Sequence, residues 1–122
     1  MALKIQPGDA LTWTNGTGSA VVSGQVVKFG TRTLGVAAVD IASAASGTVH
    51  LQGVFNVPKV SAAVWAAGEV LLWDASAAAF DDAAAVAASG DISGSVISTA
   101  AGTALQTTAE VLFLGQPGTL TA

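Results

Sequence analysis

Short apolar stretches separated by turn residues constrain this chain more than any other feature of its sequence. The stretches span residues 11–14, 20–22, 25–29, 34–39, 48–57, 70–73, 96–98 and 110–114. Glycine, asparagine, aspartate or serine lies between them, and such spacing is typical of a fold built from many short strands. We therefore expect residues 1–122 to form a mainly β, single-domain antiparallel β-sandwich or barrel with one or two short helical segments.

Both ends of the chain carry strand patterns. The first four stretches are expected to form a meander, with a turn at residues 15–18. Residues 34–39 break strict alternation, which predicts a strand that is covered on both faces or bulged at Gly35. Towards the other end, residues 92–99 and 106–114 are expected to pair as a closing hairpin.

The middle of the chain is expected to change from strand to helix at Pro58. Alternation within residues 48–57 is reset at Gly53, which tolerates a bulge or bend. The strand ends at Pro58 because proline has no N–H to donate to a strand ladder. Residues 60–67 are rich in alanine and place apolar side chains at i, i+4 and i+7, which predicts one or two helical turns with Gly68 as the C-cap.

The most alanine-rich part of the chain follows. Residues 70–73 form a short apolar run, which predicts a strand with both faces covered, and residues 77–80 are expected to pair with it. Asp81 or Asp82 is a candidate N-cap for a short helix that ends at Gly90.

Scarcity of charge indicates that the chain associates with other proteins. It is 52% hydrophobic and only 10% charged, whereas an average soluble domain has about 25% charged residues. Large exposed apolar patches are rare on soluble monomers, so we expect self-association or a protein partner. The alternative is a neutral surface made of small residues such as alanine, glycine, serine and threonine.

Charge distribution and cysteine content argue against several classes of function. The net charge is −4, and the four cations Lys4, Lys28, Arg32 and Lys59 are spread along the chain, which argues against nucleic-acid binding. We expect neither a signal peptide nor a membrane-spanning helix, because no apolar run is long enough. Cysteine is absent, which fits a protein made in a cytoplasm.

No motif for catalysis, cofactor binding or metal binding stands out. His50 is the only histidine, and we interpret it as a strand residue at a surface or interface. Residues 90–94 resemble a nucleophile motif but lack its first glycine, so a turn is expected there. Turns, caps and solubility are the expected roles of the aspartates that might pair, namely Asp74 with Asp81 and Asp82, and Asp9 with Asp91.

Most aromatic residues are expected to pack in the core, because the polar groups of a sugar-binding or base-binding site do not accompany them. Trp65 is the exception. It lies in an alanine-rich connector, and a large ring on a surface of small residues is a typical interface anchor. We therefore predict that Trp65 contacts a partner.

An ordered series of short motifs resembles the capsid cement, or decoration, proteins of tailed bacteriophages. The resemblance covers residues 4–74 and fades beyond them. Its motifs are Gln6-Pro7-Gly8-Asp9, Val22-Ser23-Gly24 with Val26-Val27, Gly35-Val36-Ala37, Gly53-Val54-Phe55-Asn56-Val57-Pro58-Lys59, and Gly68-Glu69-Val70 with Trp73-Asp74.

This resemblance implies a structural virion protein and no enzymatic activity. Such a protein binds the outside of an icosahedral head and ties neighbouring major capsid proteins together, assembling as a homotrimer or, as the second choice, a dimer. It is made in the host bacterial cytoplasm and resides on the capsid exterior. From the charge distribution, the short apolar runs and the missing motifs, we expect no cofactor, no direct nucleic-acid binding and no membrane binding.

Residues 1–9 are a possible N-terminal arm. We predict that Ala2, Leu3, Lys4, Ile5 and Gln6 add a strand to an edge of the capsid protein. The alternative is an ordinary first strand of the domain's own sheet. Two other functions stay open: a head-tail joining or tail-tube protein, and a carbohydrate-binding β module.

Overall fold

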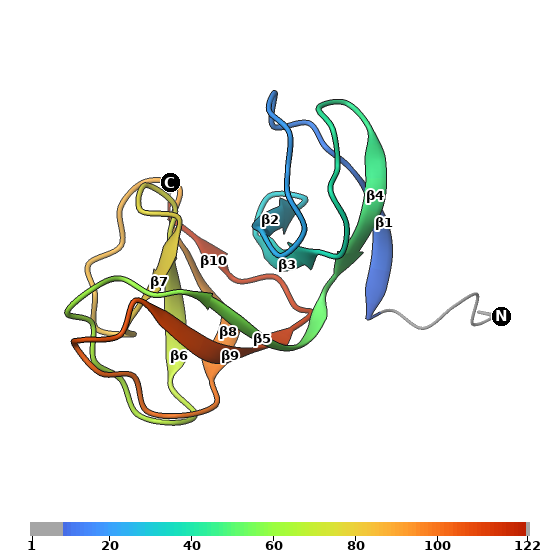
Figure 1. Ribbon diagram of the computed structural model, residues 1–122. Coiled ribbons are helices and arrows are strands. Elements are labelled where there is room, and N and C mark those ends of the chain that lie inside the picture. Colours follow the sequence, from blue (N-terminus) through green and yellow to red (C-terminus); the bar gives the residue numbers. More distant parts are fainter. Residues whose placement is uncertain (1–8, 122) are drawn as a thin grey trace, which may run out of the picture.

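The computed structural model describes residues 9–121, which form ten strands and no helix. Figure 1 shows them as two antiparallel sheets joined by the run from β4 into β5. The first sheet contains β1 (Ala10–Thr14), β2 (Val26–Phe29), β3 (Thr33–Ala37) and β4 (Ser46–His50). The second contains β5 (Gln52–Pro58), β6 (Val70–Asp74), β7 (Ala79–Asp81), β8 (Ile92–Ser98), β9 (Thr108–Leu114) and β10 (Thr119–Leu120). The predicted mainly β fold is confirmed, as a sandwich-like pair of sheets that does not close into a barrel.

The four-stranded sheet has a Greek-key order, so the predicted meander is wrong. Its strands lie in the order β1-β4-β3-β2, and β1 pairs with β4. The buried side chain of Asn15 stabilises the loop that follows β1. Its Nδ2 donates to the carbonyl oxygens of Ser19, at 2.7 Å, and Ile41, at 3.0 Å. These bonds hold the loop after β1 against Ile41, and β4, not β2, pairs with β1.

Strand β3 is covered on both faces, as its irregular pattern predicted. Leu34 and Val36 belong to the larger of two buried apolar clusters, whereas Ala37 belongs to the smaller. A Cβ at Gly35 would lie 2.6 Å from Cγ1 of Val49 and 2.9 Å from the carbonyl oxygen of His50. Glycine is therefore required where β3 and β4 approach each other.

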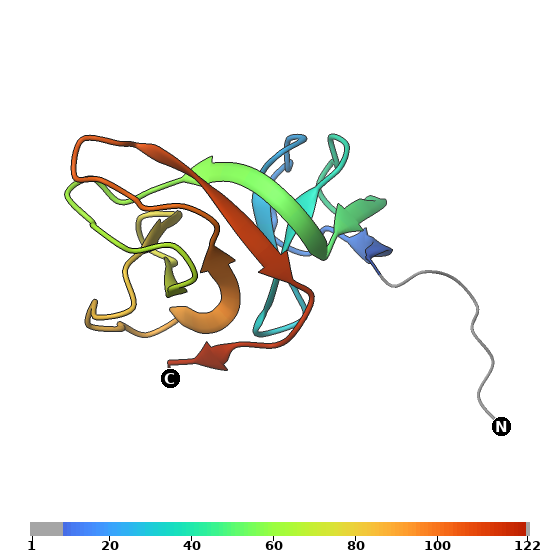
Figure 2. The same cartoon turned by 90° about the horizontal axis from the view of Figure 1, so that it is seen from below.

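The chain passes from one sheet to the other at Leu51. Gly53 has a φ of +136°, which fits the predicted change of direction at this residue. Strand β5 ends at Pro58, as predicted, and the order of the second sheet is β5-β9-β8-β6-β7, with β10 on β8. The register of β6 against β8 shifts between Val70 and Leu72, and Figure 2 shows the strong curl of β8.

The remaining strand pairings follow the predictions. Leu71, Leu72 and Trp73 of β6 are buried in succession, as expected of a strand covered on both faces. Strand β7 pairs with β6, and β8 with β9, all antiparallel.

Both predicted helices are wrong, for two different reasons. In the first segment, residues far away in the sequence bind the backbone groups that a helix needs. In residues 60–67, Val60 donates its N–H to Phe80, and Trp65 exchanges backbone hydrogen bonds with Gly102. Residues 82–90 form turns instead. Their only large apolar side chain, Val86, is 95% exposed and provides no face that packs on the core.

A buried serine links the two sheets. Ser95 of β8 is 1% exposed, and its Oγ accepts the N–H of Leu34 in β3 at 3.1 Å. The same hydroxyl donates to the carbonyl oxygen of Gln116 at 3.0 Å. The two halves therefore share polar contacts as well as the core side chains of β3.

Candidate interaction surface

The aspartates singled out in the sequence organise turns, as expected. Asp91 is 3% exposed, and its two oxygens accept the N–H groups of Ala75 and Ala88. Asp82 accepts the N–H of Ala84 at 2.8 Å. Within residues 9–121, no three His, Cys, Asp or Glu side chains gather closely enough to hold a metal ion.

Asp74 provides a pH-dependent contribution to stability. Hydrogen bonds from the Ser76 hydroxyl and the N–H groups of Ala77 and Ser76 lower the pKa of Asp74 below its ordinary value. Because the folded-state pKa is lowered, this stabilisation is complete above the ordinary aspartate pKa of about 4 and is lost as the pH falls through the folded value.

We expect Ser76→Ala to raise the pKa of Asp74, because the variant removes the strongest of these hydrogen bonds. Carbon-13 NMR titration of the Asp74 carboxyl group checks this. Urea unfolding below pH 4 or so should then show a weaker loss of stability in the variant than in the wild type. An unchanged carboxyl titration would contradict the assignment.

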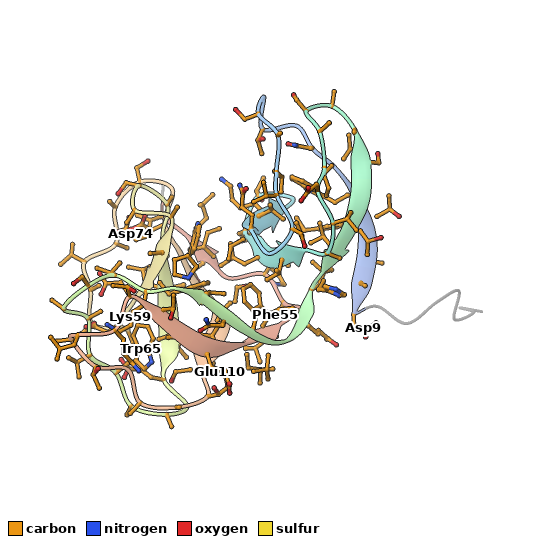
Figure 3. All side chains as sticks on the ribbon, in the orientation of Figure 1. Asp9, Phe55, Lys59, Trp65, Asp74 and Glu110 are labelled. Carbon is orange, nitrogen blue, oxygen red and sulfur yellow. The ribbon has the colours of Figure 1, made fainter. Side chains whose placement is uncertain are left out.

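His50 lies on β4 and is half-buried, in agreement with its interpretation as a strand residue. Its ring centroid lies 5.7 Å from that of Phe55 on β5, at the junction of the two sheets. Asp9 is next to this junction, and its carbonyl oxygen accepts the N–H of Leu51 at 2.7 Å (Figure 3). His50 thus supports the crossing between the sheets.

Trp65 is buried, so the predicted surface ring is wrong. Its side chain is 3% exposed and belongs to the larger core cluster. Gly102 lies against the indole, and the Nζ atom of Lys59, itself 4% exposed, lies 5.2 Å from the ring centroid (Figure 3). Sequence reasoning missed this because Gly102 and Lys59 approach Trp65 only in the folded chain.

We expect Gly102→Ala to destabilise the protein by about 1–3 kcal/mol. A Cβ at this position would lie 2.6 Å from Cε2 and 2.8 Å from Nε1 of Trp65. Thermal unfolding followed by tryptophan fluorescence measures the loss. The matched control is Gly16→Ala, because a Cβ at Gly16 meets no atom within 4 Å. Equal stability of the two variants would contradict the tight packing.

The predicted arm, Ala2, Leu3, Lys4, Ile5 and Gln6, lies outside the described residues. Sequence reasoning also missed an apolar feature of the surface. Val54 pairs with Leu112, Leu112 with Ile97, and Ile97 with Val70. Directly paired residues lie on the same face of a sheet, so these four make an apolar row across β5, β9, β8 and β6.

The apolar row lies on the outer face of the six-stranded sheet. Val54 is 53% exposed and Val70 is 43% exposed, whereas Leu112 and Ile97 are partly buried. The opposite face carries the buried Val111. Alternation along each strand was the available signal, but only the register aligns the four residues.

The four-stranded sheet offers a different kind of surface. A hollow of about 450 Å³ lies beside it, lined by Trp13, Thr14, Gly16, Thr17, Lys28 and Gly30. Its lining combines one cation, Lys28, with the side chains of two threonines and one tryptophan.

Comparison with known proteins identifies the family. A family model described as phage cement protein matches residues 5–113, a span that includes β1 to β8 and all but the last residue of β9. No curated protein matches the chain. The match agrees with the motif resemblance and extends it beyond residue 74. The chain therefore belongs to the phage cement protein family.

Proposed function

We propose that this protein binds the outer surface of a phage capsid and stabilises contacts between major capsid protein subunits. Family membership makes it a phage structural protein associated with the capsid, and this membership is the observation that carries the proposal. A structural family favours a binding role over catalysis. The protein would be made in the cytoplasm of the host bacterium and reside on the virion exterior.

The proposed mechanism is multivalent bridging. Each protomer contacts two or more capsid subunits, and many modest apolar and backbone contacts add up because the second contact is made at high effective concentration. The exposed valines of the apolar row support such binding. The bound layer would oppose the pressure of packaged DNA.

Addition of purified protein to capsids that lack it tests the proposal. Electron microscopy is expected to reveal new density on the exterior, and coated heads should release DNA at a higher temperature than bare ones. Absence of binding to heads would overturn the proposal. Rings at the head-tail junction or along a tail would support the other virion roles, and specific hits on a glycan array would support a carbohydrate-binding module.

Self-association is proposed as a homotrimer, with a dimer as the second choice. Light scattering is expected to give three times the 11.9 kDa mass of the chain. A mass equal to one chain at micromolar concentration would contradict self-association in the free protein.

The N-terminal arm, residues 2–6, is proposed to add a strand to an edge of the capsid protein. Deleting these residues is expected to weaken binding to undecorated heads, measured by cosedimentation. Unchanged binding of the deleted protein would contradict this role.

A further inference from the structure

The two halves of the protein differ in charge. Residues 9–51 carry two carboxylates, Asp9 and Asp40, and two cations, Lys28 and Arg32, so they are balanced. Residues 52–121 carry six carboxylates and one lysine, Lys59, which is 4% exposed. In the described part of the chain, the accessible charges of the six-stranded half are therefore negative. These carboxylates are Glu69, Asp74, Asp81, Asp82 and Glu110, whereas Asp91 is buried.

One of these carboxylates lies on the same face as the apolar row. Glu110 is exposed two residues before Leu112 on β9, and alternation places both on the outer face. Its carboxylate accepts the Thr99 hydroxyl at 3.0 Å. Glu69 directly precedes Val70, so alternation does not place its side chain on this face, and its oxygens accept the backbone N–H groups of Ala66 and Ala83 at 2.9 and 3.1 Å. The bond from Thr99 therefore holds the Glu110 carboxylate on the same face as the row.

We infer that the apolar row faces the capsid and accepts a patch of the major capsid protein in which apolar side chains are flanked by lysine or arginine. The inference rests on the proposed function and names the surface that performs it. Apolar contact with the row supplies affinity, and cations opposite Glu110 supply orientation and speed of association. The apolar side chains of the capsid patch would complement the row, and its cations would complement the carboxylate on the same face.

A second copy of the chain fits this face poorly. Two copies meeting through it would bring their acidic halves together, and like charges at an interface disfavour association. The balanced half, which exposes Val22 and Val39, lacks this repulsion. The charge asymmetry thus selects the capsid protein as the occupant of the apolar row.

Substitutions in the row test its contribution to affinity. Val54→Asp and Val70→Asp are expected to weaken binding to undecorated heads by about tenfold or more, because a carboxylate would be buried against apolar side chains. The matched control is Val86→Asp, whose side chain is 95% exposed on a loop outside the four strands that carry the row and which should bind like the wild type. Urea unfolding and light scattering verify that each variant is folded and has the wild-type mass.

Charge reversal tests the contribution of Glu110, the carboxylate on the same face as the row. Glu110→Lys is expected to slow association with heads about threefold or more at low salt and to weaken its salt dependence. Asp9→Lys makes the same change of net charge in the balanced half and is expected to have a smaller effect.

The outcomes separate this inference from the proposed function. If wild-type protein binds heads and the row variants bind equally well, the capsid contacts another surface and the inference is overturned, while the function stands. Row variants that lose self-association but keep head binding would make the row an interface between copies, which also overturns it. If Glu110→Lys speeds association, the capsid patch is not cationic and the inference fails.

Discussion

Replacing Phe80 with alanine is expected to lower the free energy of unfolding by about 3–5 kcal/mol. Phe80 is 0% exposed on β7, and its ring centroid lies 4.9 Å from that of Trp73 and 6.0 Å from that of Phe113. These aromatic rings come from three different strands, so removing the central one leaves a cavity that no single element can fill. Equilibrium unfolding in urea, followed by tryptophan fluorescence, measures the loss.

Val86→Ala is the control for Phe80→Ala, because its side chain is 95% exposed and its truncation should change stability by less than about 0.5 kcal/mol. The two substitutions both shorten an apolar side chain, but only one opens the core. A loss of under about 1 kcal/mol for Phe80→Ala would be incompatible with a packed interior at this position.

Replacing Asp91 with alanine is expected to cost about 3 kcal/mol, because hydrogen bonds to a charged acceptor are worth more than neutral ones. The buried carboxylate accepts the N–H of Ala75 at 3.1 Å and that of Ala88 at 2.9 Å. It thereby fixes the turn after β6 and the long turn before β8. Chemical unfolding measures the loss, and amide exchange at Ala75 and Ala88 locates it.

Two variants bracket the result for Asp91. Asp91→Asn retains one acceptor oxygen and is expected to lose roughly half as much stability. Asp82→Ala also removes a carboxylate that accepts a backbone N–H, but it does so on a more exposed loop and should cost less than about 1 kcal/mol. If Asp82→Ala is as damaging as Asp91→Ala, burial does not set the importance of these turns.

The strands were predictable because their signals are local. Alternation identified most strands, Gly53 marked the change of direction, and Pro58 marked the end of β5. Each signal reflects a restriction on one residue's own backbone or on the side chains next to it. Such restrictions do not depend on segments that are distant in the sequence.

The alanine-rich segments were mispredicted because intrinsic helix propensity contributes less free energy than tertiary contacts do. Residues 60–67 favour a helix on their own, but Trp65 pairs with Gly102 and Val60 bonds to Phe80. The same long-range pairing buries Trp65, which the sequence indicated as a surface ring. A helix in this segment would have gained little, since most helical stability comes from a packed face.

The interaction surface was only half predictable. Low charge indicated that the chain needs a partner, and the ordered motifs indicated the family that the match over residues 5–113 confirms. The apolar row was not foreseen. Its four residues, Val54, Val70, Ile97 and Leu112, belong to four separate stretches, and nothing in the sequence indicates that these stretches lie side by side. Their alignment depends on the register of three strand pairs.

The sequence by itself determined the strand-rich character of this protein, several of its strand boundaries and its low content of charged residues, because these depend on each residue and its neighbours. Tertiary structure alone decided that β1 pairs with β4, that Trp65 is buried and that four apolar side chains align on one outer face. The physical reason is that a backbone polar group can form hydrogen bonds with many partners, and an apolar side chain can pack against many partners. Only the complete set of contacts selects among them.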